Sequence, residues 1–318
     1  MGIFDKLFKP QWMSEIEYKA EQAVAKVNDP ETLRRIMAEA PTSRARAAAM
    51  KKLDDQELYR EVALTSDDVD LVLSAGRRVD DLATLESVLE RDLTGFWYMY
   101  KCDVGEQLLS VKRAELDALA SEVPEMCDAA RLVDLGAYDP KEDISLHKWS
   151  FYIKRSSYRY ECLENSAGSL RRAAVRRLAE LGDDAGLAEV IRRTADDEVA
   201  GLAVASVRDK GVLDRLALGS GLGYKATESV IAHMENAEIL RELTEVVDPF
   251  EIIPKAAAMK RLAELPCTDG EAHEWVTISE EDNSALGLYS EGPRSIDWVK
   301  RCRKCGIELE GSSRVGMW

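Results

Sequence analysis

Apolar and helix-capping residues recur along this chain with a period of about 26 residues. Each copy has a large apolar or aromatic residue that we call the anchor. An Asp or Asn stands four residues before it, and further apolar residues stand six before and three after it. Ten residues before the anchor, the side chain is small or apolar in five of six copies. The anchors are Leu33, Tyr59, Leu85, Leu187, Leu213 and Leu240. A fixed period of this length predicts a stacked array of helix pairs.

The polar residue before each anchor predicts the start of the second helix of a pair, helix B. Its side chain can accept a hydrogen bond from a free N–H in the first turn. These residues are Asp29, Asp55, Asp81, Asp183, Asp209 and Asn236. The earlier apolar residues are spaced for one face of the preceding helix, helix A. A lone pair cannot bury both faces, so neighbouring pairs must stack. An ordinary helical bundle is the alternative, but it gives no reason for a cap at constant register.

Two segments show a likeness to a known repeat family. Residues 44–62 read RARAAAMKKLDDQELYREV, and residues 171–191 read RRAAVRRLAELGDDAGLAEVI. They resemble HEAT repeats, in the short form found in many bacterial proteins. The resemblance implies an all-α fold, a HEAT-like α-solenoid of stacked helix pairs. To this fold the C-terminal cysteines described below add a small zinc-binding module. The resemblance implies no particular activity, because the family includes scaffolds, chaperone-like modules, metalloenzymes and DNA repair glycosylases.

The repeat divides the chain into five predicted segments. Residues 1–19 form an N-terminal amphipathic segment, whose apolar residues either dock on the first repeat or touch a membrane weakly. The others are HEAT-like repeats over 20–93, an aromatic-rich divergent helical insert over 94–165, HEAT-like repeats over 166–265, and a zinc-knuckle capping module over 266–318, which we call the C-terminal module. The capping motif cannot be read within the insert.

The insert holds a run of aromatic and basic residues in an otherwise acidic protein. Residues 147–160 read HKWSFYIKRSSYRY and contain no acidic residue. Such a surface can stack bases and pair with anions, or bind a protein partner through Trp, Tyr and Arg. Its candidate partner-binding residues are Lys148, Trp149, Tyr152, Arg155 and Arg159. The alternative is that the aromatic side chains fill the core of divergent repeats while the charges face solvent.

Two cysteines near the C-terminus have the spacing of a zinc knuckle. Cys302 and Cys305 can grip one tetrahedral ion, and Gly306 permits a positive-φ turn that aims backbone amides at sulfur. Cys267 and His273 would complete the site, although their spacing is longer than usual. We therefore predict a structural Zn²⁺, because four protein ligands leave no open position for catalysis. Two unrelated pairs of ordinary residues are the alternative.

The residues around this cluster predict a cap at the end of the array. The last helix A, around Ala258 and Leu262, is not followed by a helix B. Terminal repeats need a distinct outer face, which the C-terminal module can provide. Residues 276–278 predict a strand, and we expect Trp275 and Trp298 to pack over the metal site.

Composition limits the functions that are open to the chain. A net charge of −16 repels phosphates, so nucleic acid is a disfavoured partner. No apolar run approaches the length of a transmembrane helix and no signal peptide is evident, so we expect a cytoplasmic protein without stable membrane insertion. Cys102, Cys127 and Cys162 are expected to be buried thiols.

The sequence carries no recognised catalytic motif. No HExxH, GxSxG or phosphate-loop pattern occurs, and the glycines from Gly219 to Gly223 follow a helix rather than a strand, which predicts a loop. We therefore predict a non-catalytic interaction scaffold that binds a protein partner on the solenoid face or on the insert. The alternative is a nucleic-acid-binding or repair protein that acts through residues 147–160. Whether the chain is an enzyme stays open.

Overall fold

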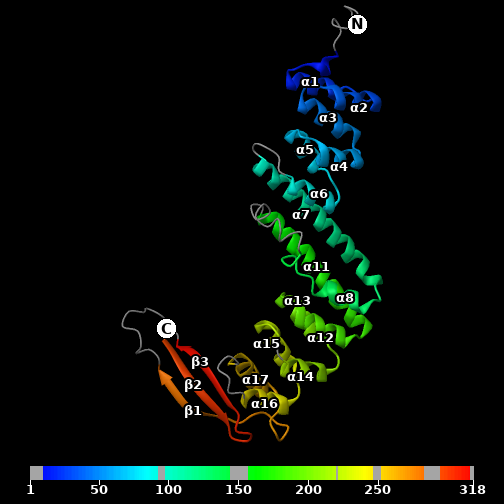
Figure 1. Ribbon diagram of the computed structural model, residues 1–318. Coiled ribbons are helices and arrows are strands. Elements are labelled where there is room, and N and C mark those ends of the chain that lie inside the picture. The colour runs from blue at the N-terminus through cyan, green and yellow to red at the C-terminus, as the bar shows by residue number, and fades with distance from the viewer. Residues whose placement is uncertain are drawn as a thin grey trace, which may run out of the picture. The chain divides into compact units, whose positions relative to one another are not determined.

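The protein is mostly helical, with a small region of strands at its C-terminal end (Figure 1). The computed structural model describes residues 10–91, 97–143, 157–219, 221–245, 252–282 and 294–315. The chain divides into two compact units. Unit 1 comprises Met1–Ser121 and Asp139–Ser169, and unit 2 comprises Glu122–Tyr138 and Leu170–Trp318. Each unit is described by itself.

Unit 1 is built from short helices that pack in chain order. Its elements are η2 (Gln11–Met13), α1 (Glu17–Ala25), α2 (Pro30–Glu39), α3 (Ser43–Leu53), α4 (Gln56–Thr65), α5 (Val69–Gly76), α6 (Leu82–Glu90), nearly all of α7 (Trp97–Glu122) and the first half of α11 (Ser157–Leu181). The A helices α1, α3 and α5 contact one another in that order, and the B helices α4 and α6 also touch. Each pair therefore packs on the next one along the chain.

Unit 2 has the same packing order and ends in a sheet. Its elements are η3 (Val123–Glu125), α8 (Ala129–Gly136), the second half of α11, α12 (Asp184–Arg193), α13 (Asp197–Ser206), α14 (Lys210–Leu218), α15 (Tyr224–His233), α16 (Ala237–Glu245), α17 (Ile252–Glu264), β1 (Trp275–Asp282), β2 (Arg294–Cys302) and β3 (Glu308–Val315). The A helices α13, α15 and α17 contact in chain order, as do the B helices α12 and α14.

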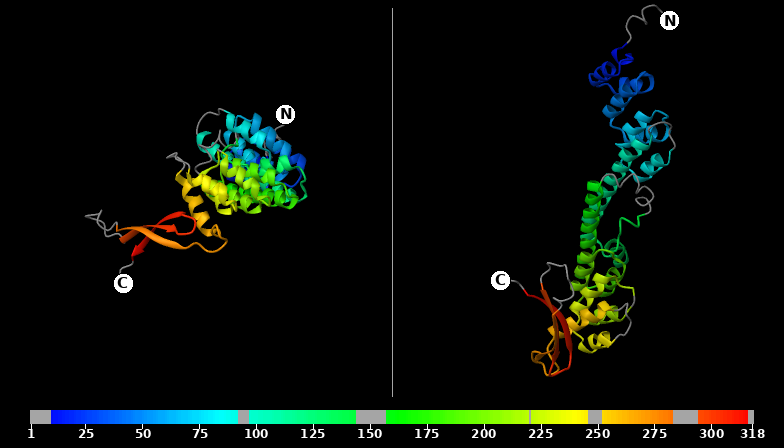
Figure 2. Two further views of the ribbon diagram at one scale, coloured as in Figure 1. Left: turned by 90° about the horizontal axis from the view of Figure 1, so that it is seen from below. Right: turned by 90° about the vertical axis from the view of Figure 1, so that its left-hand side faces the viewer.

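The three strands form an antiparallel sheet in the order β1-β2-β3 (Figure 2). Trp275 lies opposite Cys302, and Arg301 lies opposite Glu308. The predicted strand over 276–278 is thus confirmed as part of β1. Strand β3 contacts α17, which connects the sheet to the last helix of unit 2.

The capping positions predicted from the sequence are confirmed. Asp29 accepts a hydrogen bond of 2.8 Å from the N–H of Thr32, and Asp183 accepts one of 2.9 Å from Gly186. The other predicted caps act in the same way, namely Asp55 on α4, Asp81 on α6, Asp209 on α14 and Asn236 on α16. Each predicted helix B therefore starts where the period places it.

Most of the predicted interior positions are buried, Val27, Leu53 and Val62 are half-buried, and Leu181 and Arg177 depart from the register. All six anchors have exposed fractions of 3% or less. Leu181, expected to face the interior, is 42% exposed, because Leu178 fills the interior one turn earlier. Arg177 stands ten residues before the anchor Leu187, where the other copies have a small or apolar residue. Its guanidinium leaves the core and donates to the carbonyl oxygen of Met126 at 2.9 Å.

A helix inside the predicted insert obeys the same rule, contrary to our expectation. Asp128 caps α8 by accepting a 3.2 Å hydrogen bond from the N–H of Arg131. Leu132, four residues after this cap, is fully buried and is a seventh anchor. The expectation that the insert lacks the motif is therefore wrong. The copy is displaced along the sequence because the preceding helix α7 has 26 residues, compared with 8 to 11 for α1, α3 and α5.

Long side chains tie neighbouring pairs together at the ends of the A helices. Lys52 donates to the carbonyl oxygens of Ala25 and Val27, and Gln107 donates to that of Val79. Unit 2 has corresponding bonds from Arg208 to Ala179 and from Arg261 to Met234. These bonds reach backbone carbonyls at or just beyond the ends of the A helices, where the regular helical hydrogen bonds stop.

Three smaller expectations can be compared with the structure. The glycines Gly219, Gly221 and Gly223 lie between α14 and α15, which confirms a loop, and Gly221 has φ of 100°. None of the three thiols expected to be buried is fully buried, since Cys102 and Cys162 are half-buried and Cys127 is exposed. Cys127 lies in the turn before α8, where Arg177 donates to its sulfur. Of the helices described, none is both long enough and apolar enough to cross a membrane. The apolar residues predicted to dock at positions 3–8 lie outside the described residues.

Candidate metal centre

Four side chains of the C-terminal module meet at one point. Cys267, His273, Cys302 and Cys305 place their ligand atoms within 4.8 Å of one another. The Sγ atoms of Cys267 and Cys302 are 3.9 Å apart, and Sγ of Cys305 is 3.3 Å from Nδ1 of His273. A tetrahedron around an ion with bonds of about 2.3 Å has edges slightly under about 4 Å, so the spacing suits one ion. The predicted ligands come together, and the cluster can hold a metal ion.

The loop that carries Cys302 and Cys305 is shaped by its own backbone. The N–H of Cys302 donates to the carbonyl of Ile307 at 2.8 Å, and the N–H of Gly306 donates to the carbonyl of Cys302 at 2.9 Å. Gly306 has φ of 77°, a conformation that costs other residues free energy. The turn at Gly306 is therefore confirmed, and it holds both thiols on the same side of the loop.

The loop after Cys267 has a similar shape, which explains how a longer spacing still builds a site. The N–H of Cys267 donates to the carbonyl of Glu271 at 2.7 Å, and the N–H of Gly270 donates to the carbonyl of Cys267 at 2.8 Å. Gly270 has φ of 79°. The chain turns back at this glycine, so that His273 approaches Cys305 instead of being carried away from it.

His273 connects the cluster to the last helix. Its Nε2 atom lies 3.1 Å from the carbonyl oxygens of both Leu262 and Leu265, at the C-terminal end of α17. Carbonyls can only accept, so Nε2 carries the proton and Nδ1 is the atom with a free lone pair. Nδ1 is also the atom that faces Cys305. A backbone partner that fixes the tautomer of a ligand histidine is a common feature of metal sites.

Electrostatic interactions join the two loops. Lys304 lies 2.7 Å from the carboxylate of Asp269 and 3.1 Å from that of Glu271, so the two loops share an ion pair. The hydrogen bond from Lys304 holds the pKa of Asp269 below its usual value. Both acidic residues belong to the loop of Cys267, and Lys304 lies between the two cysteines of the other loop.

The pKa values of Cys302 and Cys305 shift in opposite directions. Burial opposes ionisation of Cys302, but backbone N–H groups of Cys305 and Lys304 and the ring of His273 lower its pKa to about 6. Burial, together with the neighbouring sulfurs of Cys302 and Cys267, raises the pKa of Cys305 to about 11. The charge that forms on Cys302 therefore opposes ionisation of Cys305. A bound cation would supply the charge that several thiolates need.

The described part of the C-terminal module has few buried side chains. Among its residues whose side chains are described, only Cys267 and Cys302 are buried, with exposed fractions of 5% and 1%. Trp275 lies against His273, with ring centroids 5.1 Å apart, which agrees with the expected packing. The ring of Trp298 instead lies under the ammonium group of Lys300 at 4.6 Å. The cysteine cluster thus takes the place that apolar side chains occupy in the helical units.

The other predicted site falls largely outside the described residues. Lys148, Trp149, Tyr152 and Arg155 lie outside them, and the side chain of Arg159 in α11 is not described. The surface over 147–160 therefore stays a prediction. At its end, Tyr160 is half-buried, and burial raises its pKa to about 12.

Comparison with known proteins gives no relative for this arrangement. Models of protein families, curated proteins and solved structures were compared with the chain, and none of them matches it.

Sequence reasoning missed the residues that support the ligands. The role of Lys304 as a link between loops and the contact of His273 with α17 depend on the folded positions of segments far apart in sequence. Gly270 carried a usable signal, because a glycine a few residues after a ligand cysteine can adopt the positive φ that turns the chain back, as Gly306 does four residues after Cys302.

Proposed function

We propose that this protein is a non-catalytic protein-interaction scaffold, built on a HEAT-like solenoid and closed by a structural zinc site. The observation that carries the proposal is a contrast between surfaces. The chemically distinctive cluster has four ligands and no open position, whereas the A helices of both units form open grooves. Grooves of about 760 Å³ in unit 1 and about 550 Å³ in unit 2 follow this helix face.

The ligand set supports zinc and a structural role. Three sulfurs and one imidazole nitrogen are a donor set typical of tetrahedral zinc, which four protein ligands saturate. The role is structural because, among the module's side chains that the structure describes, only the two cysteines are buried, so the cluster serves as a substitute for a core. His273 then couples the ion to α17, so the metal also fixes the module on the last helix pair.

The order of packing supports the solenoid. Within each unit the A helices contact in series, and the caps recur at constant distance from the anchors. A series of pairs presents a long row of A helices to a partner, which suits a scaffold.

The distribution of unusual titratable groups supports a function without catalysis. Among the described residues, four side chains have pKa values shifted far from their ordinary values. Two are cysteines of the cluster, and the others are the half-buried Tyr160 and the core residue Tyr59. Active sites gather such groups in an accessible cleft, and neither tyrosine lines either groove.

Site-specific photocrosslinking in the organism that makes the protein tests the scaffold. A photoreactive amino acid replaces Ser74 or Ser229, which line the grooves of unit 1 and unit 2. The same replacement at Ser87, an exposed residue of the B helix α6, is the matched control. We expect a discrete protein partner to be crosslinked from at least one groove position and not from Ser87. Crosslinks from Ser87 alone, or from no position, would contradict the scaffold.

A further inference from the structure

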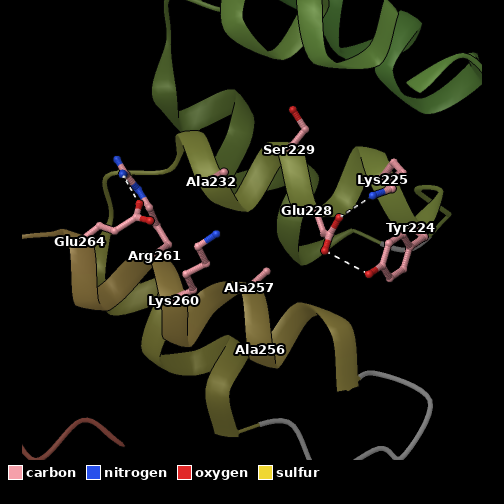
Figure 3. A pocket seen from close by; sticks show the side chains of 10 residues that line it. All are labelled: Tyr224, Lys225, Glu228, Ser229, Ala232, Ala256, Ala257, Lys260, Arg261 and Glu264. Atoms are coloured by element: carbon pink, nitrogen blue, oxygen red, sulfur yellow. Dashed lines mark hydrogen bonds and ion pairs between the residues drawn. The ribbon is translucent and has the colours of Figure 1, made fainter. Parts of the chain in front are cut away.

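The two grooves lie at corresponding places on the repeat but differ in charge. The groove of unit 1 runs between α3 and α5 with α1 beside it, and that of unit 2 runs between α15 and α17 (Figure 3). Counted from their anchors, Ala48 of α3 and Ser229 of α15 occupy the same position, and both line a groove. The two grooves can therefore be compared position by position.

The groove of unit 1 is strongly basic in a protein of net charge −16. Its lining includes five cations and one acid, and the cations are Arg44, Lys51, Lys52, Arg77 and Arg78. Lys51 and Arg78 form no ion pair and no side-chain hydrogen bond with any other described residue. These two cations are available to a ligand.

The other three cations already have protein partners. Arg44 pairs with Glu17, and Arg77 pairs with Asp103. Lys52 bonds backbone carbonyls of the preceding pair. These residues hold the walls of the groove, so the free charge on its surface comes from Lys51 and Arg78.

The groove of unit 2 shows that the fold itself does not require these charges. Ala232 takes the place of Lys51, and Glu228 takes the place of Ala47. Figure 3 shows Glu228 joined to both Tyr224 and Lys225, whose polar atoms lie 3.1 and 3.5 Å from its carboxylate oxygens. A cation in the last turn of a helix stabilises it slightly, but α15 has alanine at the position of Lys51. The basic character of the first groove is therefore an added property.

We infer that the groove between α3 and α5 binds an acidic segment of a protein partner through Lys51 and Arg78. This inference rests on the proposed scaffold and gives the partner a chemistry. A carboxylate can accept two parallel hydrogen bonds from the Arg78 guanidinium while a neighbouring carboxylate pairs with Lys51. Small side chains on the floor, including Ala47, Ala48 and Ser74, leave room for a peptide backbone.

The acids around the groove favour a peptide over nucleic acid. Glu21 lines the groove itself, while Glu17 and Asp103 stand at the paired cations. A phosphate backbone carries a charge at every nucleotide and would meet these carboxylates along its length. A short acidic peptide needs only a few cation contacts and can place neutral residues beside the acids.

The test uses full-length protein and a fluorescent peptide of ten glutamates as the probe, at low salt and at physiological salt. We expect saturable binding at low salt that weakens as salt screens the charges. The change Lys51→Ala with Ala47→Glu gives the first groove the residues of the second at these two positions. We expect affinity to fall at least about tenfold, the size of one charge-assisted hydrogen bond. The reciprocal change, Glu228→Ala with Ala232→Lys, should raise affinity.

A matched variant controls for net charge. Lys225→Ala with Lys260→Ala lowers the charge of the protein by the same amount but lies in the groove of unit 2, and it should leave the affinity within about twofold. Lys51→Ala alone, an exposed change, serves if the double variant folds poorly. Equal losses in both double variants, or no binding of the probe, would overturn the inference while leaving crosslinking at Ser74 or Ser229 as a separate test of the scaffold. Tighter binding of a single-stranded DNA of equal charge, or a Lys51-dependent dimer in place of peptide binding, would also overturn it.

Discussion

The stacked helix pairs and the C-terminal module are stabilised in opposite ways. In the helix pairs, stability is spread over repeated buried anchors, helix caps and side-chain hydrogen bonds to backbone carbonyls. In the module two cysteines supply the buried side chains among the described residues, and four ligands meet at one point. The comparison teaches that one change in the module should remove a whole structure, whereas one change in a repeat should weaken only its neighbourhood.

The largest expected effect follows from removing a ligand of the cluster. Cys302→Ser leaves three ligands and an altered donor set, so we expect metal content to fall from about one equivalent of zinc to near zero. Structural zinc contributes on the order of 10 kcal/mol to small metal domains, so the sheet should lose its fixed structure. Elemental analysis measures the metal, and near-ultraviolet circular dichroism reports on Trp275 and Trp298. Full retention of zinc in this variant would show that Cys302 is not a ligand.

A loss of stability of intermediate size is expected when the change is made in a helix pair instead of in the module. Leu85→Ala in unit 1 and Leu187→Ala in unit 2 remove fully buried anchors, and each should cost about 2–5 kcal/mol. Urea unfolding followed by helical circular dichroism measures the cost. Both variants should keep their zinc, because the metal cluster contains neither residue. Loss of zinc in Leu85→Ala would contradict the separation that the comparison describes.

Loss of a cap should cost less. Asp55→Ala, Asp183→Ala and Asp209→Ala each remove one acceptor from the first turn of a helix B, and the expected cost is about 1 kcal/mol each. The same unfolding assay detects this change, and replacement by Asn should restore most of the stability. If all three alanine variants were as stable as the natural protein, the hydrogen bonds at these positions would not be stabilising caps.

An effect as small as that of a cap concerns the one anchor that carries a hydroxyl group. Tyr59 donates to Asp54 at 3.1 Å, so Tyr59→Phe should cost about 1 kcal/mol at neutral pH. Burial, followed by the bond to Asp54, raises the pKa of Tyr59 to about 12 from an ordinary 10. Its contribution is complete below pH 10 and is lost as the pH rises through about 12, because only the unfolded state ionises readily in that window. The Phe variant should therefore lose less stability above pH 10. If the free energy of unfolding fell equally with pH in both proteins above pH 10, the raised pKa would be contradicted.

The helical architecture was readable from the sequence where its signal is local. A cap and an anchor four residues apart lie within one turn, so Asp183 and Leu187 predict the start of α12 without knowledge of the rest. The copy at Asp128 and Leu132 escaped because the length of α7 breaks the period, and a search by spacing between copies fails there. Leu181 and Arg177 departed from the pattern because a neighbouring side chain or a distant carbonyl decides where each one points.

The metal site was readable only in its ligands. The spacing of Cys302 and Cys305 is a local signal. The approach of His273 to Cys305 instead depends on a turn at Gly270, which compensates for the longer spacing between Cys267 and His273. The contact between His273 and α17 and the link through Lys304 are long-range results of folding. Residues of this kind carry no pattern that a single sequence can show.

Hydrogen exchange of the natural protein, before and after treatment with a zinc chelator, tests the central claim most directly. The claim is that a metal organises the C-terminal module and that the helical pairs do not need it. We predict that chelation releases about one equivalent of zinc and removes amide protection in β1, β2 and the end of α17, where His273 contacts the carbonyls. Amides of α4 and α12 should keep their protection. Unchanged protection in β1 after the metal is gone, or equal loss throughout the helices, would contradict the account.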